Sequence, residues 1–307
     1  MADQGLLTGS QNLLMHERVT ESLAGRSAVL RLLPLSLHEL HGVPEASLPW
    51  DDGPITGRRP KSYMEMWRQF LRGGYPELAA EPGRDSALWY SGYVQTYLER
   101  DVRGLKQIGD LTQFQSFLRV LAVRSGQLLN LSDVSRDLGI SLNTAKQWLS
   151  ILEATFQVVI VRPYYGNVGK RLVKTPKVYF TDTGLLCHLA GIRDVEHAAA
   201  GPLGGAIVET AVFSEIVKAS VHRGEDPHIH FWRTSHGVEV DVVMERGDRL
   251  IPVEVKQTAT PKPAMASGVT AFLGDYAVKA DRGWLVHMGS ERLPIAPNVT
   301  AVPFAEL

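Results

Sequence analysis

Three residues toward the C-terminal end of the chain have the types and spacing of a metal-dependent hydrolytic site. Asp241 is followed after twelve residues by Glu254 and then by Lys256, in the frame D-(x12)-E-x-K. Side chains at positions i and i+2 of a strand lie on one face, so Glu254 and Lys256 would project together. A neighbouring antiparallel strand would bring Asp241 beside them. Two adjacent carboxylates bind a hard cation such as Mg²⁺, which would activate a water for attack on a phosphodiester, with Lys256 positioning that water. The predicted catalytic residues are therefore Asp241, Glu254 and Lys256.

A third carboxylate, Glu209, lies on the helix predicted just before these strands, so the predicted metal ligands are Glu209, Asp241 and Glu254. The alternative is that Glu254 and Lys256 form the solvated face of a half-buried strand, which is the usual origin of a lone E-x-K. The apolar run around Asp241 and the helices predicted on both sides favour a nuclease-like fold. They do not establish nuclease activity, because such folds often persist after their chemistry is lost.

The elements that would position these residues form a predicted α/β domain over residues 186–307. Hydrophobic periodicity predicts a helix over 206–221, three strands in HIHFWRT, GVEVDVVMERG and RLIPVEVKQT, a helix over 264–276 and a strand in GWLVHMG. This order is that of a restriction-endonuclease-like domain.

A winged helix is predicted over residues 111–185. One helix is followed by a shorter one, which Ser132 would cap and Gly139 would end, and then by the helix in SLNTAKQWLSILEAT. A β-hairpin follows, with its turn at 166–170. A helix-turn-helix followed by a hairpin is the arrangement of a winged helix.

This predicted module carries nine Lys or Arg residues and four acidic residues, although the whole chain has a net charge of −1. Polar residues on the exposed side of its last helix would contact phosphates or base edges, and basic residues of the hairpin would neutralise phosphates. The alternative is that the winged helix docks a protein partner. The predicted DNA-binding residues are Asn143, Thr144, Lys146 and Gln147 on the helix, and Lys170, Arg171, Lys174 and Lys177 on the hairpin.

The N-terminal third reads as part of a larger α/β sheet followed by helices. Over residues 6–41 we predict a strand, a helix and a second strand in AVLRLLPLS, together forming the remnant of a core over residues 1–50. A helical segment over 51–110 would contain helices at 62–72 and 86–102. The longer of these would turn a stripe of apolar residues to the core, namely Leu88, Trp89, Tyr93, Tyr97 and Leu98.

Length and composition are those of a globular protein with more than one core. The chain has 307 residues, of which 44% are hydrophobic, and its single cysteine, Cys187, cannot form an internal disulfide. No apolar stretch reaches the ~20 residues of a membrane span, and the N-terminus lacks the pattern of a secretory signal. We therefore expect a cytoplasmic protein without a membrane partner.

Nine segments, in order, resemble one family over essentially the whole chain. They are LLTGSQNLLM, ESLAGR, LRLLPLSLHEL, GGYPE, YVQTYLERDV, ISLNTAKQWLSILEATF, KTPKVYFTDTGLL, GAIVETAVFSEI, and EVDVVM with PVEVKQT. Together they resemble the prokaryotic AAA+ ATPases whose C-terminal half is the domain of unknown function numbered 4143. The resemblance implies that Ser10 and Asn12 approach the γ-phosphate of ATP and that Arg26 reaches the nucleotide.

The sequence departs from that family in one respect. Its members carry Walker A and Walker B motifs upstream, whereas no G-x-x-x-x-G-K-[ST] loop occurs here. We therefore expect a C-terminal portion of such an ATPase, acting as a DNA- or partner-binding regulatory module, with ATP bound only in a full-length member. One alternative is a Mg²⁺-dependent nuclease of the PD-(D/E)xK type. Another is an ATP-binding protein once the upstream region is restored.

Overall fold

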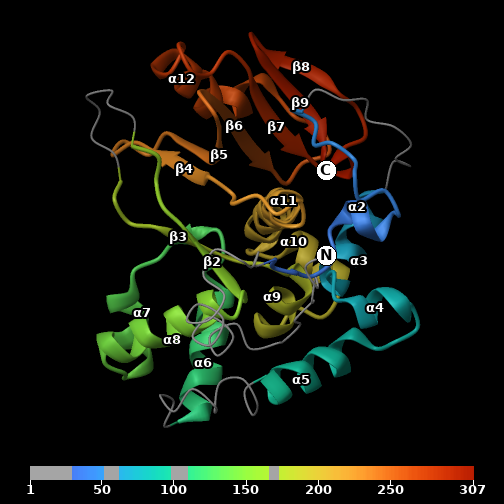
Figure 1. The fold of residues 1–307 in the computed structure, drawn as a ribbon, viewed down its shortest axis with the longest axis vertical. Helices are drawn as coiled ribbons and strands as arrows, with labels where there is room; N and C mark the ends of the chain where they lie inside the picture. The colour runs from blue at the N-terminus through green and yellow to red at the C-terminus, as the bar shows by residue number, and fades with distance from the viewer. Residues whose placement is uncertain (1–29, 52–61, 98–109, 166–172) are drawn as a thin grey trace, which may run out of the picture.

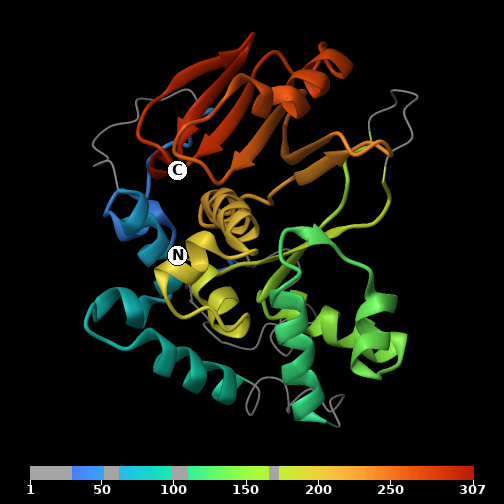
Figure 2. The same ribbon diagram turned by 180° about the vertical axis from the view of Figure 1, so that it is seen from behind.

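The computed structural model describes residues 30–51, 62–97, 110–165 and 173–307. Two β-sheets and the helices around them form a mixed α/β structure, in which the long helix α11 (Gly204–Val221) lies between the larger sheet and the helices drawn in the lower half of Figure 1. The same arrangement is visible from behind (Figure 2). Within these residues, no helix is long and apolar enough to cross a membrane.

The N-terminal part of the described chain is helical. Its elements are α2 (Leu37–Leu40), α3 (Tyr63–Arg72), α4 (Pro76–Ala80) and α5 (Ser86–Tyr97). Helix α3 begins at a capping box, in which the Ser62 side chain accepts a hydrogen bond from the backbone N–H of Glu65, and the Glu65 carboxylate accepts one from the backbone N–H of Ser62. It ends at Gly73, whose φ of 71° favours glycine.

Two predictions for this part are corrected. Residues 30–36, at the end of the strand predicted in AVLRLLPLS, form no strand. Pro34 has no N–H to donate, and the Leu35 N–H donates to the Gly74 carbonyl instead of to a sheet neighbour. In α5, Leu88 is 74% exposed rather than facing the core. The buried stripe runs through Tyr90 and Tyr97, two turns apart, and Leu88 lies off that face.

The middle part contains three helices and a three-stranded antiparallel sheet of order β1-β3-β2. Its elements are α6 (Leu111–Ala122), β1 (Gln127–Leu128), α7 (Leu131–Leu138), α8 (Leu142–Ala154), β2 (Val158–Val161) and β3 (Lys177–Phe180). Gly139 ends α7 with a φ of 65°, as predicted. The predicted cap Ser132 is wrong: Asn130 caps α7, and its side-chain oxygen accepts from the N–H groups of Ser132 and Asp133.

The β2–β3 hairpin reaches the larger sheet. Beyond β2, the Tyr164 N–H donates to the Phe231 carbonyl at 2.7 Å, and before β3 the Val173 N–H donates to the Arg233 carbonyl at 3.1 Å. Both acceptors belong to β4 (Ile229–Arg233), the edge strand of the larger sheet. The hairpin therefore covers a sheet edge that would otherwise present unpaired backbone groups.

The C-terminal part is a six-stranded mixed sheet of order β4-β5-β6-β7-β9-β8. Its further elements are β5 (Glu239–Arg246), β6 (Arg249–Lys256), η3 (Pro263–Ala266), α12 (Ser267–Asp275), β7 (Gly283–His287), β8 (Leu293–Ala296), β9 (Val299–Pro303) and η4 (Phe304–Glu306). Strands β4, β5 and β6 are antiparallel, whereas β6, β7 and β9 are parallel. Helix α11 shares a core with Val253 and Val255, and α12 shares the other core with Val243 and Leu285.

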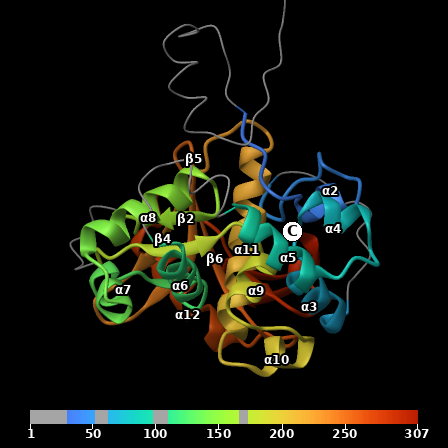
Figure 3. The ribbon, with the colours of Figure 1, turned by 90° about the horizontal axis from the view of Figure 1, so that it is seen from below.

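Two short helices, α9 (Thr183–Leu189) and α10 (Val195–Ala200), connect β3 to α11. Seen from below, α9 and α10 lie along α11 (Figure 3). Cys187 is buried within α9.

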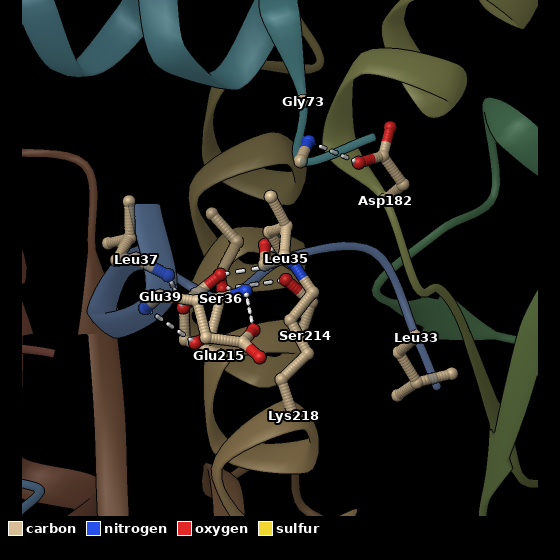
Figure 4. A network of polar contacts seen from close by, with 12 residues as sticks. Leu33, Leu35, Ser36, Leu37, Glu39, Gly73, Asp182, Ser214, Glu215 and Lys218 are labelled. Atoms are coloured by element: carbon tan, nitrogen blue, oxygen red, sulfur yellow. Dashed lines mark hydrogen bonds and ion pairs between the residues drawn. The ribbon is translucent and has the colours of Figure 1, made fainter. Parts of the chain in front are cut away.

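Buried polar side chains of α11 form hydrogen bonds with the backbone of the segment before α2 (Figure 4). Glu215 Oε2 accepts a hydrogen bond from the Leu37 N–H at 2.6 Å, and Lys218 Nζ donates to the Leu35 carbonyl at 3.2 Å. Glu215 and Lys218 also pair with each other at 3.1 Å. We call residues 33–39 the strap, because they lie across α11 and end in α2.

Candidate functional site, an acidic cluster at the junction of the two sheets

The sheet register brings Asp241 and Glu254 together, as the spacing predicts. Val242 pairs with Val253, so Asp241 and Glu254 are the next residues along two adjacent antiparallel strands. The Val255 N–H donates to Asp241 Oδ2 at 2.8 Å. Lys256 Nζ lies 2.5 Å from Glu254 Oε1. The three predicted catalytic residues are thus neighbours at the end where β5 begins and β6 ends.

Glu209 reaches the same place from α11. Its Oε1 accepts a hydrogen bond from the Tyr179 hydroxyl at 2.6 Å and another from Lys177 Nζ at 2.8 Å. Tyr179 and Lys177 are two residues apart on β3 and therefore share a face. All three predicted metal ligands belong to one cluster, but a second lysine lies among them.

Lys177 is the central cation of this cluster. Besides Glu209, its Nζ lies 2.6 Å from Glu239 Oε1 and 3.8 Å from Asp241 Oδ1. The side chain is only 4% exposed. The prediction that Lys177 neutralises phosphates on the hairpin surface is therefore wrong. Its strand is the middle one of its sheet and packs against α11, which turns Lys177 inward.

We call the set Lys177, Tyr179, Glu209, Glu239, Asp241, Glu254 and Lys256 the acidic cluster. Sequence reasoning missed Glu239, Lys177 and Tyr179. Glu239 was detectable, because it stands two residues before Asp241 and so shares its strand face. Lys177 and Tyr179 gave no such signal, since their contacts join strands from different sheets.

Burial shifts the pKa values of the carboxyl groups upward. Burial and the nearby charge of Asp241 raise the pKa of Glu254 to about 8 and that of Glu209 to about 7. Burial also raises the pKa of Asp241 above its ordinary value. Glu254 is 6% exposed, so it does not belong to a solvated strand face. At neutral pH the cluster therefore retains protons that exposed carboxylates would lose.

The pKa of Lys177 is also raised, but by its charged neighbours and not by burial. Burial alone would lower the pKa of Lys177, but interactions with Tyr179 and the carboxylates of Glu209, Asp241 and Glu239 outweigh it and raise that pKa well above its ordinary value. Lys177 is thus a fully charged ammonium. Arg233 adds a third cation, with its guanidinium 2.8 Å from Glu239 Oε2.

The donor set has the chemistry of a divalent-cation site, but its arrangement is that of a salt-bridge network. Carboxylate oxygens are the ligands that Mg²⁺ and Mn²⁺ prefer. Within the described ranges, however, no group of three or more His, Cys, Asp or Glu side chains is arranged to hold a metal ion. Glu254 Oε2 is buried and has no hydrogen-bond partner among these residues. Lys177 stands where the carboxylates of α11 and β5 meet.

The predicted DNA-binding residues on α8 lie on its outward side. Asn143, Lys146 and Gln147 are exposed, whereas Thr144 is half-buried and its hydroxyl lies 2.8 Å from the Ser141 hydroxyl at the helix cap. The opposite side, with Ala145, Trp148, Leu149 and Leu152, is buried.

Fewer basic residues around α8 are available to contact DNA phosphates than their number in the sequence suggests. Lys174 is exposed, but Lys170 and Arg171 lie outside the described residues. Arg124 pairs with Asp137 at 2.9 Å, and Arg136 pairs with Asp133 at 2.7 Å. The local excess of positive charge is thereby partly neutralised within the module.

The predicted nucleotide-binding residues Ser10, Asn12 and Arg26 also lie outside the described residues. Their role stays a prediction from the family resemblance.

Comparisons with known proteins give relatives without an assigned activity. Uncharacterized proteins of Mycobacterium bovis and Mycobacterium tuberculosis are each 30% identical over 299 residues, which cover 97% of this chain and 61% of the relative. An uncharacterized protein of Haemophilus influenzae is 27% identical over 261 residues, covering 81% of this chain and 58% of that protein. The chain thus spans about three fifths of the length of these relatives.

No solved structure matches the chain significantly. Two family profiles match, and they divide the chain just before α11. Residues 64–196 match a domain of unknown function, DUF8612, and residues 204–307 match the domain of unknown function DUF4143.

Proposed function

We propose that this chain is a binding module that contacts double-stranded DNA through α8 and has no ATP hydrolysis of its own. The observation that carries the proposal is the two-sided character of α8: a buried apolar face fixes the helix, and Asn143, Lys146 and Gln147 project from its other side. A helix presented in this way can enter a major groove.

The order of elements supports the same proposal. Helix α6, strand β1, helices α7 and α8, and strands β2 and β3 follow one another as in a winged helix, with a Gly-containing turn between α7 and α8. The hairpin differs from a free wing, because its far end pairs with β4. We therefore assign the contact mainly to α8 and expect a small contribution from Lys174.

Binding should depend on salt, but less steeply than for a strongly basic protein. With Lys146 and Lys174 as the exposed lysines of the proposed surface, we expect two or three phosphate contacts. The slope of log K against log salt would then be about −2 to −3. Fluorescence anisotropy with a labelled duplex at ~50 to 200 mM salt measures both affinity and slope.

The variant Lys146→Ala/Gln147→Ala should weaken binding at least about tenfold, which is the loss expected from one good helix contact. Lys262→Ala, an exposed lysine after β6, is the matched control and should bind like the wild type. If no duplex binds even at low salt, DNA is not the partner, and a protein-docking role for the same module is favoured. Because the relatives are longer than this chain, ATP binding by a longer protein stays a prediction.

A second candidate function is a Mg²⁺-dependent nuclease of the PD-(D/E)xK type. It is favoured by one observation, the juxtaposition of Asp241, Glu254 and Lys256 on adjacent strands. Plasmid nicking with Mg²⁺ or Mn²⁺ tests it. Cleavage by the wild type that Asp241→Ala abolishes and Glu225→Gln retains would support this function, because Glu225 is an exposed acid outside the cluster. Equal cleavage by the wild type and Asp241→Ala would reject it.

A further inference from the structure

Two amide side chains project from the outward side of α8. Asn143 and Gln147 are exposed, and among the described residues neither has a hydrogen-bond partner. They are four residues apart, so they differ by about 40° around the helix axis and by ~6 Å along it. Helices α7 and α8 lie at the margin of the molecule in Figure 1 and Figure 3, in agreement with this exposure. The two carboxamides therefore share one outward stripe of the helix.

The orientation of this stripe is fixed by packing on the opposite side of α8. Trp148 packs edge-on against Phe114 and Phe117 of α6, with ring centroids 5.3 and 5.5 Å away. At the start of the helix, the Ser141 side chain accepts a hydrogen bond from the Thr144 N–H at 3.0 Å. These contacts fix the rotation of α8 about its axis, so the amides need little reorganisation to bind a ligand.

The exposed side chains in the first turns of α8 match the major-groove pattern of A·T base pairs. Asparagine and glutamine each form two hydrogen bonds with N6 and N7 of adenine, and an apolar side chain contacts the thymine methyl group. Leu142, which is 37% exposed and precedes Asn143, supplies such an apolar contact. Residues 141–150 contain no arginine, which most often reads guanine, and no acid, which reads cytosine.

Lys146 is the cation of this stretch, and its place on the helix suits a phosphate. It lies about 100° around the axis from Gln147 and ~60° from Asn143, toward the edge of the exposed side. A lysine at that flank reaches the sugar-phosphate backbone, while the amides face the base edges. The acid Glu153 belongs to the C-terminal end of α8, away from the N-terminal residues that contact bases in this arrangement.

We propose that α8 recognises A·T base pairs in the major groove, with Asn143 and Gln147 each binding one adenine. Each amide oxygen accepts a hydrogen bond from the N6 amine, and each amide nitrogen donates one to N7. Because a base step is about 3.4 Å along one strand and the two residues are ~6 Å apart, the two adenines lie one or two steps apart. The inference rests on the proposed DNA binding through α8 and adds the base preference to it.

Three labelled duplexes of equal length test the preference without knowledge of a target sequence. They alternate dA with dT, dG with dC, and deoxyinosine with dC. The inosine duplex presents the G·C pattern in the major groove but, like A·T, lacks the guanine amine in the minor groove. By fluorescence anisotropy at ~50 mM salt, we expect the wild type to bind the A·T duplex at least about tenfold more tightly than either other duplex.

The variant Asn143→Ala/Gln147→Ala should bind all three duplexes with similar, weaker affinity, because Lys146 and Lys174 remain to contact phosphates. Gln113→Ala removes an exposed amide of α6 and is the matched control, which should keep the wild-type preference. Replacing adenine by 7-deazaadenine, which lacks N7, should weaken binding by the wild type but not by the double variant. Circular dichroism confirms that the double variant is folded.

The outcomes separate this inference from the proposed function. Equal affinity of the wild type for the three duplexes, or a preference for G·C, would overturn the adenine readout and leave DNA binding in place. Equal affinity for the A·T and inosine duplexes would also overturn it, because the reading would then take place in the minor groove. So would an A·T preference that the double variant retains. If no duplex binds, both proposals fail.

Discussion

The pKa values of Glu209 and Glu254 are both raised above that of an exposed glutamate, and the rise is larger for Glu254. Burial and the charge of Asp241 raise its pKa to about 8, even though Lys256 lies 2.5 Å away. The sign of the effect on stability follows from the raised value. The folded chain holds this proton more tightly than the unfolded chain, so stability falls as pH rises from the ordinary glutamate range through the folded pKa.

Replacing Glu254 by Gln removes this titration and nearly preserves the shape of the protonated acid. At pH ~4.5, the ordinary pKa of a glutamate, we expect Glu254→Gln and wild type to have similar free energies of unfolding. At pH ~8.5 the variant should gain on the order of 2 kcal/mol relative to the wild type, because it has no buried charge to accommodate. Urea denaturation at both pH values measures the difference.

The exposed acid Glu225 supplies the control for this comparison, since Glu225→Gln should show the same relative stability at both pH values. A relative gain for Glu254→Gln that is larger at low pH would contradict the assigned direction of the pKa shift.

At the scale of elements, α11 is held by charges on two sides. Glu209 joins it to β3, and the pair Glu215 and Lys218 joins it to the strap. Both members of that pair are less than a tenth exposed. A buried pair is rarely a net source of stability, but removal of one partner is costly because the other charge stays buried.

Lys218→Met should therefore destabilise the chain by about 3 kcal/mol, because Glu215 would then keep, among the described residues, the Leu37 N–H as its single donor. Lys218→Met/Glu215→Gln should recover part of that loss, since the glutamine oxygen can still accept from Leu37. Urea denaturation of the two variants gives the coupling energy. Equal destabilisation by the single and double variants would show that the buried charge is not the cause.

The elements most accurately predicted from the sequence are those with a clear hydrophobic periodicity. Helices α8 and α11 and strands β5 and β6 lie close to where the apolar spacing puts them. The strand predicted through residues 30–36 failed because Leu35 and Leu37 pair with groups around α11, not with a sheet. Such long-range contacts leave no local period. Strands β8 and β9 were missed, and each contains a proline, Pro294 or Pro303, which weakens the strand signal.

The contrast between local patterns and long-range contacts also explains which residues of the acidic cluster could be predicted. Asp241, Glu254 and Lys256 were predictable, because strand alternation and one hairpin connection bring them together. Lys177 was assigned to the surface because its neighbours in sequence, Lys174 and Arg171, are those of a basic hairpin. Only the docking of the hairpin on β4 and α11 turns Lys177 inward, and that docking is a property of the tertiary structure.

At the scale of the whole molecule, two matched domains share one buried helix. The matches end at residue 196 and begin at residue 204, yet α11 packs against β3 and α9 on one side and against β6 on the other. The ion pair between Lys177 and Glu239 joins the two matched domains across this boundary, and so do the hydrogen bonds from the β2–β3 hairpin to β4. The two domains should therefore unfold together.

Hydrogen exchange at increasing urea concentration tests this. In the wild type, the amides of α8 and β5 should lose protection at the same urea concentration, because opening either domain exposes α11 and breaks the buried ion pairs. Lys177→Met/Glu239→Gln removes one of the links across the boundary, and we expect α8 to lose protection before β5 in that variant. If α8 and β5 already separate in the wild type, the acidic cluster does not couple the domains.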